Sequence, residues 1–249
     1  MSQGALFVTG GSRGIGEAVV LAALSAGRDV AFTFHANEAR ANEVLARAKA
    51  EHPDRVCRAY RLDVRDSTAV ESVVDQVVDA FETVDAVVAN AGVNVNNLAV
   101  HMTDDEWRVV LDTNLTGSFF VARQFLTPFL GQGHGRLVFV SSLGAHGVSG
   151  QANYSASKAG LLGLSSALAK EYGRRGITSN VVELGFFDTD MTREGMSAQN
   201  REFWMKYCPQ GRIASPVEAA RVVLFLASDD ASFVNGQSIP VNGGLDWAP

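Results

Sequence analysis

Two side chains that can exchange a proton stand one helical turn apart. Tyr154 and Lys158 are separated by four positions, and most of their neighbours are small residues. On a helix, this spacing places both side chains on one face. A free phenol has a pKa of about 10, too high for efficient proton transfer at neutral pH, and a nearby ammonium favours the phenolate. The pair is therefore a candidate acid–base site, although a surface tyrosine beside a solvated lysine has the same spacing.

A glycine-rich turn follows the first apolar run of the chain. The run Ala5–Thr9 leads into Gly10-Gly11-Ser12-Arg13-Gly14-Ile15-Gly16, and a helical pattern begins at once. Glycines allow a close approach to a pyrophosphate, while a helix N-terminus offers N–H groups to an anion. The alternative is an ordinary turn that caps a helix. We expect a dinucleotide to bind at Gly10, Ser12, Arg13, Gly14, Ile15 and Gly16.

The end of the second apolar run indicates which dinucleotide is bound. A carboxylate at this place binds the ribose 2′-hydroxyl of NAD and repels the 2′-phosphate of NADP. The run ends Phe34-His35-Ala36-Asn37, and the first acid is Glu38. Arg13, inside the glycine-rich turn, offers a guanidinium that binds phosphate well. The sequence therefore favours NADPH over NADH, unless Arg13 is only a solvated surface cation.

Short apolar runs alternate with segments of helical period along the whole chain. The runs are Ala5–Thr9, Val30–Phe34, Val56–Leu62, Ala86–Ala89, Arg136–Val140, Ile177–Val182 and Ser238–Val241, and the helical segments lie at about 15–26, 38–51, 67–82, 104–130, 153–173 and 216–227. This pattern predicts an α/β fold over residues 1–249: a single doubly wound Rossmann-type domain with a seven-stranded, mostly parallel sheet and helices on both faces. The irregular segment at about 188–215 is expected to form a lid, because long structureless connections are usually functional.

Composition argues against several classes of protein. The 249 residues carry 21 basic and 27 acidic side chains, a net charge of −6, whereas a protein that binds nucleic acid is usually basic. Cys57 and Cys208 are too few for a disulfide framework, and the five histidines lack the paired spacing of metal ligands. Neither a signal peptide nor a membrane span is visible. We expect a cytoplasmic protein without nucleic-acid, membrane or metal partners.

Several motifs, taken in order, make the chain resemble the short-chain dehydrogenase/reductase family. They are the turn Thr9–Gly16, Asp63-Val64, Asn90-Ala91-Gly92, Asn114, the serine pair Ser141-Ser142, Tyr154-Ser-Ala-Ser-Lys158 and Gly185-Phe-Phe-Asp-Thr-Asp-Met191. Each motif is weak alone, but together they have the family's spacing and span essentially the whole chain. The stretch from Gly150 to Gly160 most resembles 3-oxoacyl-[acyl-carrier-protein] reductases and related polyketide ketoreductases.

The resemblance implies a catalytic set of Asn114, a serine, Tyr154 and Lys158. Tyr154 would protonate the alkoxide, the serine would hydrogen-bond the substrate carbonyl, and Asn114 would hold a water of a proton relay. Lys158 would also hold the ribose of the nicotinamide. Relatives usually place the serine thirteen residues before the tyrosine, which selects Ser141, whereas counting along the fifth strand selects Ser142. We favour Ser142, because strands keep register better than loops keep length.

The resemblance also implies the rest of the cofactor site. Asp63 would accept the adenine amino group, with Val64 beside it. The wall beside the cofactor and the contacts near the nicotinamide would come from residues that follow the fourth and sixth strands, which are Asn90, Ala91, Gly92, Gly185, Phe187 and Thr189.

The implied reaction is hydride transfer from NADPH to the C3 carbonyl of a 3-oxoacyl thioester on an acyl carrier protein, within a homotetramer. Arg174 and Arg175 are the expected basic residues at the entrance, since a carrier protein is acidic. The lid aromatics Phe203, Trp204 and Tyr207 belong to the core or form a wall for a flat acyl chain, as in polyketides. Two alternatives stay open: a dehydrogenase of a free alcohol, sugar or steroid, and a non-catalytic nucleotide-binding subunit.

Overall fold

The computed structural model describes residues 4–194 and 198–245, and these residues form one seven-stranded sheet. Its strands are β1 (Ala5–Val8), β2 (Val30–Phe34), β3 (Cys57–Arg61), β4 (Val84–Ala89), β5 (Gly135–Ser142), β6 (Ile177–Leu184) and β7 (Ser238–Val241). The strands lie in the order β3-β2-β1-β4-β5-β6-β7, and each neighbouring pair runs parallel. The predicted doubly wound α/β fold is confirmed.

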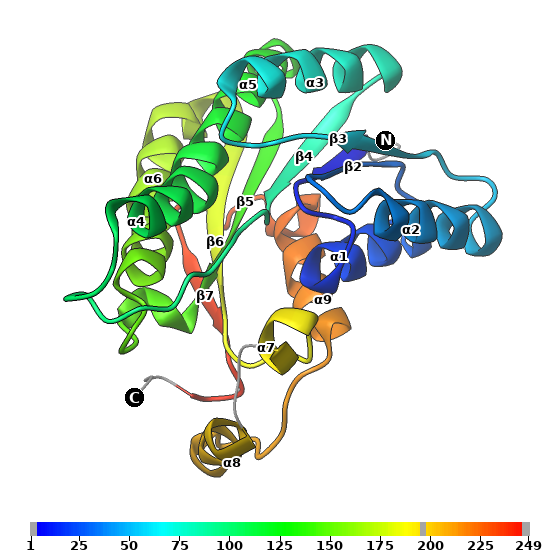
Figure 1. Cartoon of the computed structure of the whole chain (residues 1–249). Helices are drawn as coiled ribbons and strands as arrows, with labels where there is room; N and C mark the ends of the chain where they lie inside the picture. The colour runs from blue at the N-terminus through cyan, green and yellow to red at the C-terminus, as the bar shows by residue number, and fades with distance from the viewer. Residues whose placement is uncertain (1–3, 195–197, 246–249) are drawn as a thin grey trace.

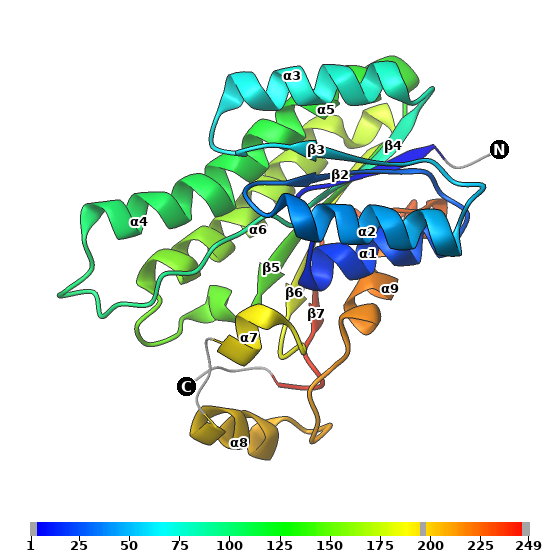
Figure 2. The ribbon, with the colours of Figure 1, turned by 45° about the vertical axis from the view of Figure 1, so that its right-hand side comes forward.

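Helices cover both faces of the sheet (Figures 1 and 2). One face carries α1 (Gly14–Ser25), α2 (Glu38–Glu51) and α9 (Pro216–Leu226); the other carries α3 (Ser67–Ala80), α4 (Asp104–Leu111), α5 (Gly117–Gln132) and α6 (Ala152–Tyr172). Side chains of β1 show why both faces need cover. Leu6 and Val8 pack in the core under α1, whereas Phe7 packs in the core under α5. A strand buried on both faces is apolar throughout, as the sequence pattern indicated.

The order of the strands reverses between β1 and β4. The chain winds outward from β1 to β3 on one side and from β4 to β7 on the other. At such a switch point, the connections that leave the two central strands diverge, and ligands bind in the crevice beyond the carboxyl ends of the strands. The glycine-rich turn follows β1 and Asn90 follows β4, so both lie at this crevice.

The segment 104–130 is helical as predicted, with a π-helical turn, Asp112–Thr116, between α4 and α5. The segment 188–215 is not irregular throughout, because it contains the short helices α7 (Asp190–Glu194) and α8 (Ala198–Tyr207). Both helices lie beyond the carboxyl ends of β5 and β6 (Figure 1). The hydrophobic pattern of α8 is weak because the helix stands apart from the sheet.

Two strands extend further than their apolar runs. The predicted fifth and sixth strands end at Val140 and Val182, whereas β5 continues through Ser142 and β6 through Leu184. Three of the added residues, Ser141, Ser142 and Glu183, carry polar side chains at the carboxyl ends of the strands, where the crevice lies. Across the described ranges, every helix is too short or too polar to cross a bilayer.

Candidate active site

The glycine-rich turn between β1 and α1 is shaped by contacts that only glycine permits. Gly10 and Gly14 have φ angles of 66° and 59°, in the left-handed region that favours glycine. A Cβ atom on Gly16 would stand 2.2 Å from the carbonyl oxygen of Gly10. Because glycine has no side chain, a pyrophosphate would contact the main chain directly at these positions. The turn therefore fits a dinucleotide.

The first turn of α1 offers its N–H groups to an anion. Arg13 occupies the N-cap position with extended backbone, and its side chain makes no capping hydrogen bond in the described part of the chain. The Arg13 side chain is exposed, as a guanidinium that meets a phosphate must be. Ser12 and Gly16 are buried behind it, and Ile15 is partly buried. The structure thus brings the predicted residues of the turn together around one helix N-terminus.

Side chains from β4 and β1 hold the turn in place. The amide nitrogen of Asn90 donates to the carbonyl oxygens of Thr9 and Gly10, at 2.9 and 3.1 Å. The Thr9 hydroxyl accepts hydrogen bonds from the backbone N–H groups of Asn90 and Ala91. Asn90 and Ala91, which the family resemblance suggested, therefore act first as braces of the glycine-rich turn.

Asp63 is paired with a residue that the sequence analysis did not consider. Its two carboxylate oxygens accept hydrogen bonds from the Arg65 guanidinium, the shortest at 2.6 Å. Hydrogen bonding to Arg65 lowers the pKa of Asp63 to about 2. His35, at the end of β2, approaches the same carboxylate at 3.6 Å. Asp63 is thus ionised and partly satisfied at the place predicted for the adenine. Val64 is buried against Gly117.

The chain after β6 returns to the glycine-rich turn. Thr189 lies against Gly14, since a Cβ on that glycine would be 3.6 Å from the Thr189 methyl carbon. Gly185 is wedged against Asn242, and its N–H donates to the Val241 carbonyl oxygen. The ring of Phe187 is buried in the core under α1 and α9, so only its main chain is left to face the crevice.

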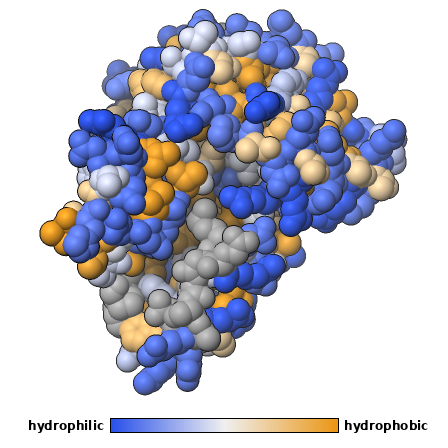
Figure 3. Space-filling view, in the orientation of Figure 1, coloured by the Kyte–Doolittle hydropathy of each residue, from blue (hydrophilic) through white to orange (hydrophobic). Residues whose placement is uncertain are grey.

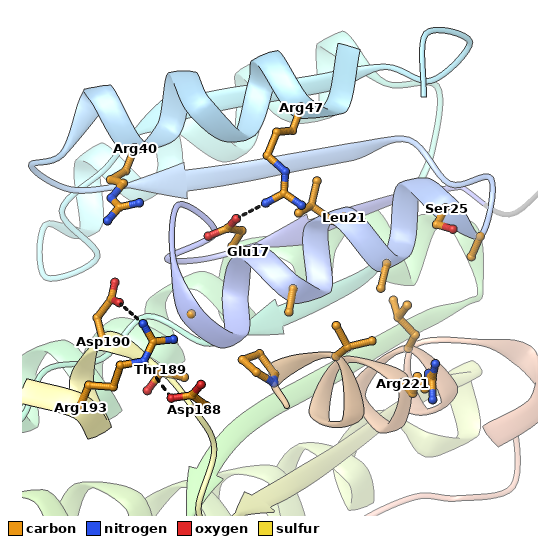
Figure 4. Close-up of a pocket in the computed structure, with 17 residues that line it drawn as sticks. Glu17, Leu21, Ser25, Arg40, Arg47, Asp188, Thr189, Asp190, Arg193 and Arg221 are labelled. Atoms are coloured by element: carbon orange, nitrogen blue, oxygen red, sulfur yellow. Dashed lines mark hydrogen bonds and ion pairs between the residues drawn. The ribbon is translucent and has the colours of Figure 1, made fainter. Parts of the chain in front are cut away.

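A groove of about 770 Å³ opens on the outer side of this contact, between α1, α2, α7 and α9 (Figure 4). Gly14 and Thr189 lie at its inner end. Arg193 on α7 donates to Asp188 at 2.8 Å and approaches Asp190 at 3.7 Å, so its charge is compensated within the same segment. The groove adjoins the predicted pyrophosphate site and does not contain Tyr154.

Tyr154 and Lys158 project from the first turns of α6 toward the end of β5. The ammonium nitrogen of Lys158 lies 5.7 Å from the centre of the Tyr154 ring. It donates to the Val140 carbonyl oxygen at 2.8 Å, and the side chain is almost fully buried. A Cβ on Gly92 would stand 3.5 Å from this nitrogen, so glycine leaves the space beside Lys158 open. The two residues form a compact pair at the crevice.

The two candidate serines have different surroundings. The Ser142 hydroxyl lies on the side of Gly144 where the Tyr154 ring packs, lowers the pKa of that phenol, and accepts a hydrogen bond of 3.1 Å from the Gly144 backbone N–H. Ser141 points into the protein and donates to the Lys158 carbonyl oxygen at 3.0 Å. Adjacent residues of a strand face opposite sides, so only one of them can meet Tyr154. That one is Ser142.

Burial shifts the pKa values of Tyr154 and Lys158 in opposite directions. It raises the pKa of Tyr154 above its usual value, an effect that the hydrogen bond from Ser142 partly opposes. It lowers the pKa of Lys158 to about 8. In the protein without a cofactor, desolvation is the larger effect, so the pKa of Tyr154 lies above its ordinary value. The Lys158 ammonium is the stronger acid of the pair.

The π-helical turn gives Asn114 its place. The wider turn points the side chain at the loop after β4, where its amide nitrogen donates to the Val93 carbonyl oxygen and to Ser157, both at 3.0 Å. Its Oδ1 atom accepts from the Val93 N–H at 2.8 Å. Asn114 is fully buried, and a Cβ on Gly92 would be 3.2 Å from Oδ1. The structure thus brings Asn114 beside Lys158, with its amide bonded to protein.

Sequence reasoning missed several residues of this site. Arg65, Ser157 and the carbonyl of Val140 bond directly to predicted site residues. Asn153 is also buried, and it ties the start of α6 to the Val95 carbonyl oxygen and to α4. A polar residue next to Tyr154 is a weak signal in sequence, because polar residues are common at helix starts.

The proposed basic entrance was placed at the wrong end of the molecule. Arg174 and Arg175 lie in a short 3₁₀ turn after α6, just before β6 begins. Tyr154 lies near the opposite end of α6, and the helix rises about 27 Å from Tyr154 to its last residue, Tyr172, at 1.5 Å per residue. Neighbours in sequence lie far apart here because a long helix separates them. These two arginines do not flank the crevice of their own chain.

A parallel sheet of this order, with a glycine-rich turn at its switch point and a serine, tyrosine and lysine beside it, defines a nicotinamide-dependent oxidoreductase. A family model described as "Enoyl-(Acyl carrier protein) reductase" matches residues 10–246. The chain belongs to the short-chain dehydrogenase/reductase family, which confirms the resemblance.

Individual relatives match almost the whole chain. The 3-oxoacyl-[acyl-carrier-protein] reductase FabG of Escherichia coli (strain K12) is 38% identical over 239 residues, which are 96% of this chain and 95% of that protein. The protein of the same name from Staphylococcus aureus (strain Mu50 / ATCC 700699) is 39% identical over 246 residues, 98% of each. The crystal structure of levodione reductase superposes with a TM-score of 0.94 at 30% identity, covering 97% of each chain.

Proposed function

We propose that the protein reduces the C3 carbonyl of a 3-oxoacyl thioester, carried by an acyl carrier protein, to the 3-hydroxyacyl form with NADPH. The reaction would serve fatty-acid or polyketide synthesis. The near full-length similarity to two 3-oxoacyl-[acyl-carrier-protein] reductases supports this substrate class. The observation that carries the proposal is the grouping of Ser142, Tyr154 and Lys158 at the end of β5, with the Lys158 ammonium 5.7 Å from the centre of the Tyr154 ring.

The arrangement suits a carbonyl better than any other reacting group. A bound reduced nicotinamide supplies a hydride for the carbonyl carbon, and negative charge then develops on the oxygen. The Ser142 hydroxyl stabilises that charge by a hydrogen bond, and the Tyr154 hydroxyl donates its proton to the same oxygen. Lys158 then returns a proton to Tyr154, since its ammonium is the stronger acid. Asn114 keeps the neighbouring loop in place and lies on the proposed route of the proton.

Residues at the glycine-rich turn and just after β2 support NADPH as the reductant. Arg13 is exposed at the glycine-rich turn, and the end of β2 presents His35 and Asn37 where an NAD-specific site presents a carboxylate. The wall of the proposed cofactor site would come from Asn90, Ala91, Gly92, Gly185 and Thr189. A higher kcat/KM with NADH than with NADPH would refute this part of the proposal.

An aromatic pair suggests which acyl chains fit best. Phe186 and Trp204 stack with ring centres 4.9 Å apart at 30°, and both are only partly buried. Phe186 follows Leu184 by two residues, and Leu184 is the register partner of Ser142 on the neighbouring strand. The stack therefore begins close to the proposed reacting carbonyl. Flat, conjugated acyl chains would gain most from contact with these rings.

The test is a turnover panel monitored by NADPH absorbance. It compares 3-oxoacyl thioesters, free and carrier-linked, with the matching 2-enoyl thioesters and with small ketones and steroids. We expect 3-oxoacyl thioesters to react fastest, carrier-linked forms to have the lower KM, and conjugated chains to be favoured over saturated chains of equal length. Faster turnover of enoyl thioesters or of free ketones would contradict the substrate assignment, and no NADPH oxidation at all would indicate a nucleotide-binding subunit.

We also propose that the chain assembles as a homotetramer. Several large apolar side chains are exposed on the single chain, among them Trp107 on α4, Phe119 on α5, Phe225 on α9 and the fully exposed Phe233. Figure 3 shows apolar atoms gathered on the side formed by α4 and the loop before it. Exposed patches of this kind mark interfaces. Light scattering is expected to give four times the chain mass of 26.5 kDa, and a monomer would refute the proposal.

A further inference from the structure

A buried carboxylate lies beside the proposed site and has no part in the reaction described above. The Glu183 side chain is only 8% exposed. It lies on β6, a strand that is covered on both faces. Its Oε2 atom accepts a hydrogen bond from Nε2 of His146 at 2.7 Å, and its Oε1 atom accepts one from the Ser238 hydroxyl on β7. Three separate segments of the chain therefore meet at one carboxylate.

The fold alone does not require this group. Glu183 is buried while the His146 side chain is 56% exposed, and a buried carboxylate is costly to desolvate, so the strand alone would be served as well by an apolar residue. What the pair does achieve is local: it ties the turn after β5 to strands β6 and β7. His146 is the last residue of that 3₁₀ turn, which runs Leu143–His146. The next residue, Gly147, has a φ of 102°, in the region that favours glycine, and the chain turns there toward α6.

The other end of the same turn bears directly on the proposed catalytic residues. Ser142 is its N-cap, and the Gly144 N–H donates to the Ser142 hydroxyl oxygen. A Cβ on Gly144 would stand 3.2 Å from the Tyr154 ring, so the main chain of the turn packs against that ring. Because the Ser142 oxygen accepts from Gly144, its proton is directed to Tyr154 or to a substrate carbonyl. If the turn Leu143–His146 moved away from α6, both contacts of Gly144, with Ser142 and with the Tyr154 ring, would be lost.

We propose that Glu183 and His146 form a positioning pair for the active site, which holds the turn Leu143–His146 so that Gly144 stays hydrogen-bonded to Ser142 and packed against Tyr154. The inference rests on the proposed function only in naming Ser142 and Tyr154 as reacting groups. Neither Glu183 nor His146 touches the substrate in this account. The pair acts through the turn.

The test compares His146→Leu, which removes the donor, with His146→Gln, which keeps an N–H donor near the carboxylate. His134→Leu is the matched control, because His134 also approaches a carboxylate, that of Asp229, at 3.8 Å. His134 lies just before the start of β5, at the amino ends of the strands and away from Tyr154. We expect His146→Leu to lower kcat about tenfold or more with the KM for NADPH within about twofold of the wild type, a change of about 1.4 kcal/mol in the barrier. His146→Gln should keep most of the rate, and His134→Leu should keep all of it.

A second readout does not depend on turnover. The ultraviolet difference spectrum of phenolate formation, taken against the same variant carrying Tyr154→Phe, gives the titration of Tyr154 alone. We expect His146→Leu to move this titration to higher pH, because the hydrogen bond from Ser142 that favours the phenolate is weakened. A purely structural pair would lower the melting temperature and leave the titration and kcat unchanged, and that result would overturn the proposal.

Two further controls keep the outcomes distinct. If His146→Leu does not fold, His146→Asn repeats the comparison with a polar side chain too short to reach Glu183. If the wild type reduces no 3-oxoacyl thioester, the proposed function fails, while the Tyr154 titration still supports or refutes the positioning pair.

Discussion

Replacing Ser142 and Ser141 by alanine, one at a time, separates a reacting hydroxyl from a structural one. The Ser142 hydroxyl lies near Tyr154 at the crevice, whereas the Ser141 hydroxyl is buried against the main chain of α6. The two residues are neighbours on β5; Ser141 is buried and Ser142 is partly buried. Each variant is therefore a close control for the other.

The two losses have different sizes and appear in different assays. Removing a hydrogen-bond donor to a developing oxyanion lowers kcat by about 10²- to 10³-fold, or about 3–4 kcal/mol in the barrier. Removing the Ser141 donor leaves the Lys158 carbonyl oxygen without that partner and costs about 1 kcal/mol of stability. In a chain of this size, that corresponds to a fall in melting temperature of about 2–4 °C.

The assay is steady-state reduction of a 3-oxoacyl thioester, followed by NADPH absorbance, with thermal unfolding of each variant. We expect Ser142→Ala to lose kcat with a melting temperature near that of the wild type, and Ser141→Ala to show the reverse. If Ser141→Ala lost 10²-fold or more in kcat and Ser142→Ala kept its rate, the assignment of Ser142 as the serine that hydrogen-bonds the substrate oxygen would be refuted.

Three further predictions concern charge and shape. The pKa of Lys158 is about 8 in the folded protein and 10.5 in the free side chain, so the unfolded chain binds more protons between these two pH values. The free energy of unfolding should therefore rise by up to about 3 kcal/mol from pH 8 to pH 10.5. Urea titrations should show this rise in the wild type but not in Lys158→Met; parallel curves would contradict it. Gly16→Ala, whose Cβ meets the Gly10 carbonyl, should weaken NADPH binding at least about 100-fold by calorimetry, and unchanged affinity would refute the role of the turn. Arg13→Ala should lower kcat/KM for NADPH about tenfold or more and leave that for NADH nearly unchanged; equal losses would make Arg13 a general structural residue.

Features with a local signal were predictable from the sequence. Buried parallel strands leave short apolar runs, so all seven strands could be located, and the glycines of the turn after β1 indicated a close approach of the main chain. Counting along β5 favoured Ser142, and the structure directs that residue to Tyr154. A strand fixes the face of each residue, so Ser142 and Ser141 lie on opposite faces of β5, while the catalytic role of Ser142 stays a prediction.

Features that depend on contacts between distant residues could not be predicted. Glu183 and His146 are 37 positions apart, and neither has a neighbour in sequence that points to the other. The π-helical turn at Asn114 replaces regular helix because the side chain bonds to the loop after β4, which helical periodicity does not reveal. Arg174 was misplaced because closeness in sequence was taken for closeness in space, across a helix of 21 residues.

The central claim is that the Tyr154 hydroxyl donates the proton that completes ketone reduction. The most direct measurement is kcat for Tyr154→Phe with saturating NADPH and a 3-oxoacyl thioester, together with the affinity for NADPH. We expect kcat to fall about 10²- to 10⁴-fold with cofactor affinity within about threefold of the wild type, since only the acid is removed. Turnover at the wild-type rate would contradict it.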